Sequence, residues 1–154
     1  MEDYIYEYDL DIKEDIDKLS VEQLKAFVSE NIFKCVYGTF TNIDVGLAGL
    51  ILTSQNTLYK EFLATKGDMS TDWILDTENV GVHGIYIHKG EELKINFIYK
   101  DKTRGFNLKR NHFYMFPYWL THRFESTKEE ECAFFHFRLP FEKRLITKDK
   151  KVWW

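Results

Sequence analysis

The stretch VGVHGIYIHKGEELKINFIYK, residues 80–100, decides the fold, because two runs rich in β-branched and aromatic residues flank a polar turn. Similar short runs continue to residue 139, with turn residues such as HKGEE, KDKTRG and STKEEE between them. We therefore expect strands over residues 72–77, 80–88, 92–100, 106–116, 120–126 and 131–139. A series of short antiparallel strands is typical of a β-sandwich or barrel.

The first part of the chain has a different pattern. YIYEYDL at 4–10 predicts an opening strand, and Ser20 with Gln23 forms a capping box for a helix over 20–33. We also expect a strand at 34–40 and a second short helix at 58–65, whereas 41–52 fits either a strand or a buried helical turn. The sequence thus predicts one α+β domain, residues 1–154, in which N-terminal helices pack on one face of a mainly antiparallel β-structure.

The composition limits the classes of function. With a net charge of -4, the chain lacks the overall basic field of a nonspecific nucleic-acid-binding protein, although a local basic patch remains open. The acidic N-terminus does not resemble a signal peptide, and the longest apolar stretch, residues 45–52, is too short to span a membrane. We therefore expect a cytoplasmic protein with no membrane partner, for which nucleic acid is not the expected ligand and homo-oligomers remain open.

Two segments, a basic patch within residues 102–110 and the C-terminal tail, each have two possible explanations. Lys102, Arg104, Lys109 and Arg110 form a basic patch that is either a contact for an acidic partner or an ordinary charged strand face. The tail TKDKKVWW, residues 147–154, ends on two tryptophans that we expect to pack back on the domain rather than stay exposed.

The five histidines, all in the strand-rich half, are the best candidates for chemistry: His83, His88, His112, His122 and His136. Side chains alternate along a strand, so His83 and His88 face opposite sides unless a bulge intervenes, which Gly84 could supply. A pair from different strands suits a shared metal better. His88, beside the turn carrying Glu91 and Glu92, and His122, which enters a later strand, form the preferred pair. Two imidazoles and a carboxylate form the site of non-haem Fe(II) enzymes, whereas ordinary surface or interface histidines are the alternative. We expect His112 and His136 to be structural.

FPYWLTH, residues 116–122, resembles the segment that brings in the second iron-binding histidine of small phage-type 2-oxoglutarate/Fe(II) oxygenases. The preceding residues 72–99 and the opening strand and helix are also similar to that family, so the resemblance covers most of the chain. It implies a double-stranded β-helix, a jelly-roll-like or cupin-like sandwich. It also implies Fe(II) bound by His88, Glu91 or Glu92, and His122, with 2-oxoglutarate as cosubstrate. The substrate would be a small molecule or a protein side chain.

The chain departs from the family pattern at two places. The family has His-x-Asp or His-x-Glu where this sequence has His88-Lys-Gly-Glu91. Its basic residue for the far carboxylate of 2-oxoglutarate should lie near Cys132 or Ala133, and Arg138, on the same face as Cys132, is the nearest substitute. The hypotheses are a divergent Fe(II)/2-oxoglutarate oxygenase-like protein or a noncatalytic β-sandwich, such as a viral binding or structural protein, that associates through its aromatic surface.

Overall fold

The computed structural model describes residues 4–12, 16–43, 57–64, 73, 75, 80–126, 128–141 and 143–153. Its elements, in chain order, are β1 (Tyr6–Asp9), η2 (Ile16–Lys18), α1 (Val21–Thr39), β2 (Thr57–Ala64), β3 (Gly81–Lys89), β4 (Leu93–Tyr99), β5 (Lys102–Asn107), β6 (His112–Pro117), β7 (Thr121–Ser126) and β8 (Glu130–Pro140). The strands form a five-stranded sheet of order β1-β6-β3-β8-β2 and a three-stranded sheet of order β5-β4-β7, and every pair is antiparallel.

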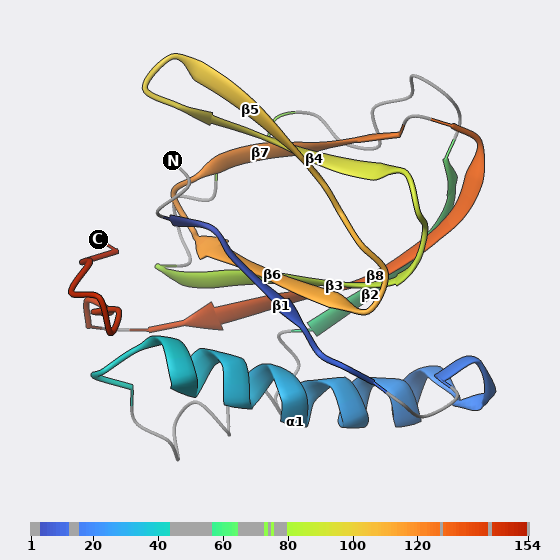
Figure 1. Ribbon diagram of the computed structural model, residues 1–154, viewed down its shortest axis with the longest axis horizontal. Helices are drawn as coiled ribbons and strands as arrows, with labels where there is room; N and C mark the ends of the chain where they lie inside the picture. The colour runs from blue at the N-terminus through green and yellow to red at the C-terminus, as the bar shows by residue number, and fades with distance from the viewer. Residues whose placement is uncertain are drawn as a thin grey trace.

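The described elements form three layers. The three-stranded sheet lies over one face of the five-stranded sheet, and α1 runs along the other face (Figure 1). One apolar cluster fills the space between the helix and the large sheet, and a second one fills the space between the two sheets. The fold is therefore an α+β structure of sandwich type, and the predicted antiparallel β-structure with helix packed on one face is confirmed.

Helix α1 begins where the sequence predicts. The Ser20 hydroxyl accepts a hydrogen bond from the Gln23 amide at 3.2 Å, and the Gln23 side chain accepts one from the Ser20 amide at 3.0 Å. The helix continues to Thr39, so the strand predicted over residues 34–40 is wrong. Its buried stripe extends through Ile32 and Val36, and packing against the sheet overrides the local preference of 34–40 for strand.

Strand β2 replaces the short helix predicted at 58–65. It pairs with β8 over its whole length, and Tyr59 packs on Phe135 with ring centroids 4.9 Å apart. The predictions for residues 44–52 and for most of the strand at 72–77 lie outside the described residues. Trp73 and Leu75 are described within the latter segment, and neither belongs to a strand.

The other strands follow the sequence closely, except around residues 100–111. The segment predicted as one strand, 106–116, contains the end of β5 and all of β6 except Pro117, with an irregular connection between them. The predicted turn KDKTRG is shorter than expected, because Tyr99 already pairs with Lys102 and only two residues connect β4 to β5.

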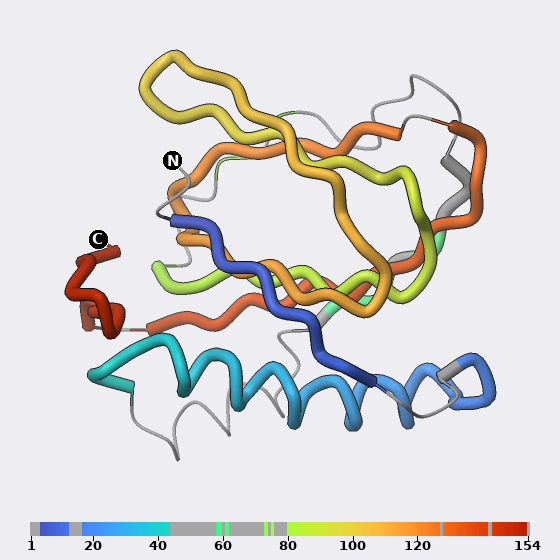
Figure 2. The backbone as a smooth tube through the Cα atoms, in the orientation of Figure 1, coloured from blue at the N-terminus to red at the C-terminus, as the bar shows by residue number. Residues whose placement is uncertain are grey.

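The C-terminal tail packs back on the domain as predicted for Trp153. The Trp153 side chain is fully buried, and the Trp153 backbone carbonyl accepts a hydrogen bond from the indole nitrogen of Trp119. The tail lies beside the end of α1, where Phe40 and Thr147 form an isolated bridge (Figure 2). In the described part of the chain, no helix has the length and apolar character needed to cross a membrane.

Substitution by alanine should have opposite effects on stability at two glycines, Gly84 and Gly38. A Cβ at Gly84 in central strand β3 would overlap the Phe113 ring, whereas a Cβ at Gly38 near the end of α1 would meet nothing within 4 Å. Gly84→Ala should lower the free energy of unfolding by about 1–3 kcal/mol through overpacking. Gly38→Ala should raise it by up to about 1 kcal/mol, since alanine favours the helix. Urea denaturation of both variants measures the difference, and equal effects would contradict the packing described here.

Candidate functional site

Three histidines from three strands meet between the two sheets. His83 lies on β3, His122 on β7 and His136 on β8, and their exposed fractions are 1%, 1% and 9%. The His83 ring centroid lies 5.2 Å from that of His136 and 6.1 Å from that of His122. We call these three residues the histidine cluster. The histidine cluster includes residues of both sheets, because β3 and β8 belong to the five-stranded sheet and β7 belongs to the three-stranded sheet.

Aromatic rings surround His122. Its ring centroid lies 4.9 Å from Phe116, 6.2 Å from Phe97 and 6.2 Å from Phe124, three residues of the core between the sheets. Its Nδ1 lies 3.1 Å from the Leu120 carbonyl oxygen. Because a carbonyl only accepts, Nδ1 carries the proton in this bond, and Nε2 of the neutral ring has the lone pair. This hydrogen bond fixes the orientation of the His122 ring.

Arg138 lies beside the cluster. It is the direct cross-strand partner of His83 in the β3–β8 ladder, and paired residues project on the same face of a sheet. Its side chain is partly buried, and within the described residues its buried Nε has no hydrogen-bond partner. A guanidinium in this position favours an anionic group nearby, since carboxylates and phosphates match its donor geometry.

The predicted ligand set of His88, Glu91 and His122 is not assembled. His88 shares its charged neighbours Asp17 and Arg110 with Tyr86, a residue of the core between sheet and helix, whereas His122 lies between the sheets. The two imidazoles are therefore in different layers. Regular alternation along β3 sends position 83 into the space between the sheets, whereas His88 lies where the β3–β8 register shifts, between Ile87 and Lys89.

The predicted carboxylates lie in the turn that follows β3. The Glu91 side chain is 79% exposed and forms a long ion pair of 3.9 Å with Lys128. The amides of Glu91 and Glu92 both donate to the Glu130 carboxylate, at 2.9 and 2.7 Å. This contact joins the turn after β3 to the start of β8.

His88 is buried without being part of the cluster. Burial, followed by the positive charges of Lys89 and Arg110, lowers the pKa of His88 below its usual value, although Asp17 and Glu61 act in the opposite direction. Within the described residues its buried Nδ1 has no hydrogen-bond partner. We infer that His88 is a neutral core residue at neutral pH.

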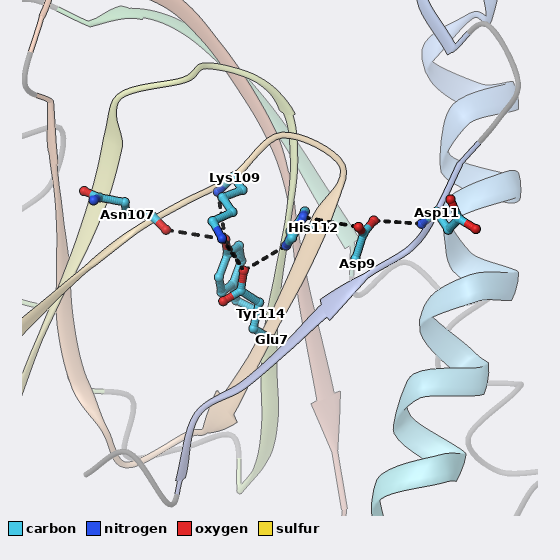
Figure 3. Close-up of polar contacts among 7 residues, drawn as sticks. All are labelled: Glu7, Asp9, Asp11, Asn107, Lys109, His112 and Tyr114. Atoms are coloured by element: carbon cyan, nitrogen blue, oxygen red, sulfur yellow. Dashed lines mark hydrogen bonds and ion pairs between the residues drawn. The ribbon is translucent and has the colours of Figure 1, made fainter.

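His112 has the structural role that the sequence predicts. Its Nδ1 lies 2.8 Å from Glu7, its Nε2 lies 3.8 Å from Asp9, and the Tyr114 hydroxyl donates to the same Glu7 carboxylate at 3.2 Å (Figure 3). Lys109 adds an ion pair of 3.9 Å to Glu7. These contacts attach edge strand β1 to β6.

The histidine cluster contains nitrogen atoms that can bind a metal, but its side chains do not have the geometry of a metal site. As the side chains stand, no group of three or more His, Cys, Asp or Glu in the described part of the chain is arranged to hold a metal ion. Two imidazoles that share one ion have ring centroids roughly 4.5–5.5 Å apart, given metal–nitrogen distances of about 2.0–2.1 Å. The His83–His136 spacing of 5.2 Å fits this range, and His122, at 6.1 Å from His83, lies slightly outside it.

No model of a known protein family matches the chain, and a search of curated proteins finds no match either. The resemblance to 2-oxoglutarate/Fe(II) oxygenases therefore rests on the sequence alone, chiefly on residues 116–122, which end at His122. Within the segment, Phe116 and His122 lie in contact between the sheets.

Sequence reasoning placed His122 and Arg138 among the site residues and missed His83 and His136. The strand periodicity contains a signal for His136. Residues 132, 134, 136 and 138 share one face of β8, so His136 lies on the same face as Arg138. The register that brings His136 next to His83 depends on pairing between β3 and β8, which a single sequence does not specify.

The pKa of His88 gives a testable pH dependence. Its folded value lies below the unfolded value of about 6.5, so the unfolded chain binds a proton first as the pH falls. Stability is therefore lost progressively below about pH 6.5. His88→Gln should reduce this loss, measured as the difference in free energy of unfolding between about pH 7.5 and 5.5. Equal losses in the variant and the original protein would contradict a neutral, buried His88.

Proposed function

We propose that the protein is a divergent Fe(II)/2-oxoglutarate oxygenase-like protein whose metal ligands are His83, His122 and His136. The observation that carries the proposal is the meeting of three buried imidazoles beside a partly buried arginine. Imidazole nitrogens are suitable ligands for ferrous and other divalent transition-metal ions. This set replaces the one expected from the sequence, keeps His122, and substitutes two histidines for His88 and Glu91.

The strand connections support a double-stranded β-helix of the jelly-roll type. From β3 onward the chain passes between the sheets at four connections, namely β3–β4, β5–β6, β6–β7 and β7–β8. Repeated crossing between two antiparallel sheets is the pattern of that architecture. In this arrangement, residues near the start of β7 and on β8 face each other across the interior, where the resemblance expects the second histidine and the basic residue.

The cost of burying polar rings also supports a ligand site. A polar side chain in a sandwich core loses hydration that an apolar side chain would not need to lose. His83, His122 and His136 are nevertheless buried at a single point, among residues such as Phe97 and Phe116 that exclude water.

Each residue has a defined role in the proposed site. The Leu120 carbonyl would orient the His122 ring by accepting a hydrogen bond from Nδ1. Arg138 would hold a carboxylate of the cosubstrate through charge-assisted hydrogen bonds. Ferrous iron, when bound, would supply oxygen binding and activation, and the surrounding phenylalanines would keep bulk water from the site.

Metal binding tests the proposal directly. Metal-stripped protein titrated with Fe(II) and 2-oxoglutarate under nitrogen should develop a weak visible charge-transfer band and a higher melting temperature. His83→Ala, His122→Ala and His136→Ala should each weaken Fe(II) binding by more than about 100-fold, beyond the effect of an outer-shell change. Arg138→Gln should retain the metal and weaken 2-oxoglutarate binding by about tenfold or more.

His88→Ala is the matched control, because His88 is as buried as His136 but lies in the other layer. It should leave the band intact, as should His112→Ala, and circular dichroism would verify that each variant folds. Loss of the band in His88→Ala, with retention in His83→Ala, would restore the ligand set expected from the sequence. Absence of both band and thermal shift in the unmodified protein would favour the noncatalytic β-sandwich.

A further inference from the structure

A small cavity lies between β1, the end of α1 and the C-terminal tail. Its volume is about 200 Å³, and it is lined by six residues, namely Tyr6, Tyr8, Gly38, Thr39, Lys148 and Asp149. They come from three segments that are distant in the sequence, and the tail meets the helix at this point (Figure 2). The cavity is separate from the histidine cluster, because its two tyrosines pack against the core between the helix and the five-stranded sheet.

Two tyrosines form the wall of the cavity on the sheet side. Tyr6 and Tyr8 are two residues apart on β1 and project on the same face, with ring planes 12° apart and ring centroids 6.4 Å apart. Tyr6 packs on the buried Trp153, with ring centroids 5.8 Å apart. The Tyr8 hydroxyl bonds the Thr39 hydroxyl, and the Tyr6 hydroxyl donates to Asp149 at 3.4 Å. The wall is therefore held in place at both ends of the rings.

Asp149 provides a negative charge at the cavity. Its Oδ1 accepts hydrogen bonds from the hydroxyl groups of Thr147 and Tyr6. The bond from Thr147 has the largest effect in lowering the pKa of Asp149, and the charge of Lys151 acts in the same direction. The carboxylate is therefore ionised at neutral pH. Within the described residues its Oδ2 accepts no hydrogen bond, and the exposed side chain leaves this atom open to an external donor.

Lys148 provides a positive charge at the same cavity. Its backbone amide donates to the Thr39 carbonyl at 2.9 Å, which places the residue at the end of α1. In the part of the chain that the structure describes, no ion pair reaches its exposed side chain. The lining thus carries one charge of each sign. A ligand that carries both signs is complementary to it, whereas a simple anion or cation meets one like charge.

Gly38 leaves the helix side of the cavity open. A Cβ at this position would meet no atom within 4 Å, so crowding does not require glycine. Its backbone does not require glycine either, because among the described glycines only Gly90 has a positive φ. Glycine nevertheless weakens a helix relative to alanine. A residue that lowers local stability without a steric reason is typical of a functional position.

We propose that this cavity binds a small α-amino acid. The ammonium group of the ligand would donate to Oδ2 of Asp149, and its carboxylate would accept from Lys148, both through charge-assisted hydrogen bonds. Its side chain would pack on Tyr6 and Tyr8. The end of α1, whose last turn contains no basic residue, has a partial negative charge that also favours an ammonium group nearby.

The volume limits the size of the amino acid. A protein cavity of about 150 Å³ holds benzene, which has six carbon atoms. By this ratio, a cavity of about 200 Å³ holds about eight non-hydrogen atoms. Valine has that size, and we use it as the probe.

The ordinary explanation for these contacts is attachment of β1 and the tail to α1. It accounts for the bond between Tyr8 and Thr39 and for the bond between Tyr6 and Asp149. It does not account for the space that remains beside these bonds or for an uncrowded glycine within the helix. A ligand in the cavity accounts for both.

An NMR titration of the full-length protein with L-valine tests the proposal. The amide signals of Gly38, Thr39, Lys148 and Asp149 should shift with a dissociation constant on the order of 1 mM. Isovalerate, which lacks only the amino group of valine, and isobutylamine, which lacks only its carboxylate, should each bind about tenfold more weakly or worse. No shift of these signals at about 50 mM L-valine, or binding of either analogue as tight as that of valine, would overturn the proposal.

Two charge variants correspond to the two analogues. Asp149→Asn should weaken valine binding about tenfold or more without weakening that of isovalerate, and Lys148→Gln should weaken valine binding without weakening that of isobutylamine. Asp101→Asn and Lys150→Gln are the matched controls, because each removes an exposed charge of the same sign that does not line the cavity. Equal losses in the controls would show a general charge effect and overturn the assignment.

Gly38→Leu tests the position of the ligand. Because no atom lies within 4 Å of a Cβ at this position, the variant should fold, which circular dichroism verifies. The leucine side chain should occupy the open space and weaken valine binding about tenfold or more. Unchanged affinity in the folded variant would show that valine binds elsewhere and overturn the proposal.

Discussion

Burial of strand β3 on both faces is the constraint on which the rest of the structure depends. β3 pairs with β6 on one side and β8 on the other, and residues 81–88 are all buried. Val82 and Tyr86 belong to the core under the helix, whereas Ile85 and Ile87 belong to the core between the sheets. A shift of one residue would exchange the two sets, and the double burial therefore fixes the register strongly.

The same constraint determines which histidines can meet. Position 83 has the parity of Ile85 and enters the space between the sheets, and position 88 lies close to charged groups of η2, β2 and the segment before β6. The irregular pairing between Ile87 and Lys89 does not move His88 to the other layer, because its electrostatic neighbours remain Asp17, Glu61 and Arg110. A site that includes His122 must therefore recruit β3 through His83.

Much of the fold was predictable from local patterns, whereas the site required tertiary information. The capping box at Ser20 and the alternation along β3 and β7 are local, and they gave the helix start and the strands. The segment 34–40 was mispredicted because its aromatic and β-branched residues favour a strand in isolation, while burial of Val36 on the sheet extends the helix. The proximity of His136 to His83 depends on the β3–β8 register, which lies beyond local pattern.

The cost of burying charge explains why Glu91 and Glu130 lie at the surface and not in the core between the sheets. An ionised carboxylate in the core between the sheets would lose far more hydration energy than a neutral imidazole. Glu91 stays exposed, and Glu130 binds two backbone amides at the molecular edge. A histidine-rich interior is consequently compatible with folding before any ligand binds, whereas a carboxylate in the same place would require a cation for its stability.

Charge is also separated along the basic stretch that begins at Lys100. Its later residues are neutralised by acids from the N-terminal region, since Arg110 pairs with Asp17 at 2.7 Å and Lys109 approaches Glu7 at 3.9 Å. These two pairs hold β1 and η2 against the start of β6. The patch predicted from sequence is therefore two structures. One part, Lys109 and Arg110, attaches the N-terminal segment to the sheet, and the other, Lys102 and Arg104, lies on the exposed edge strand β5.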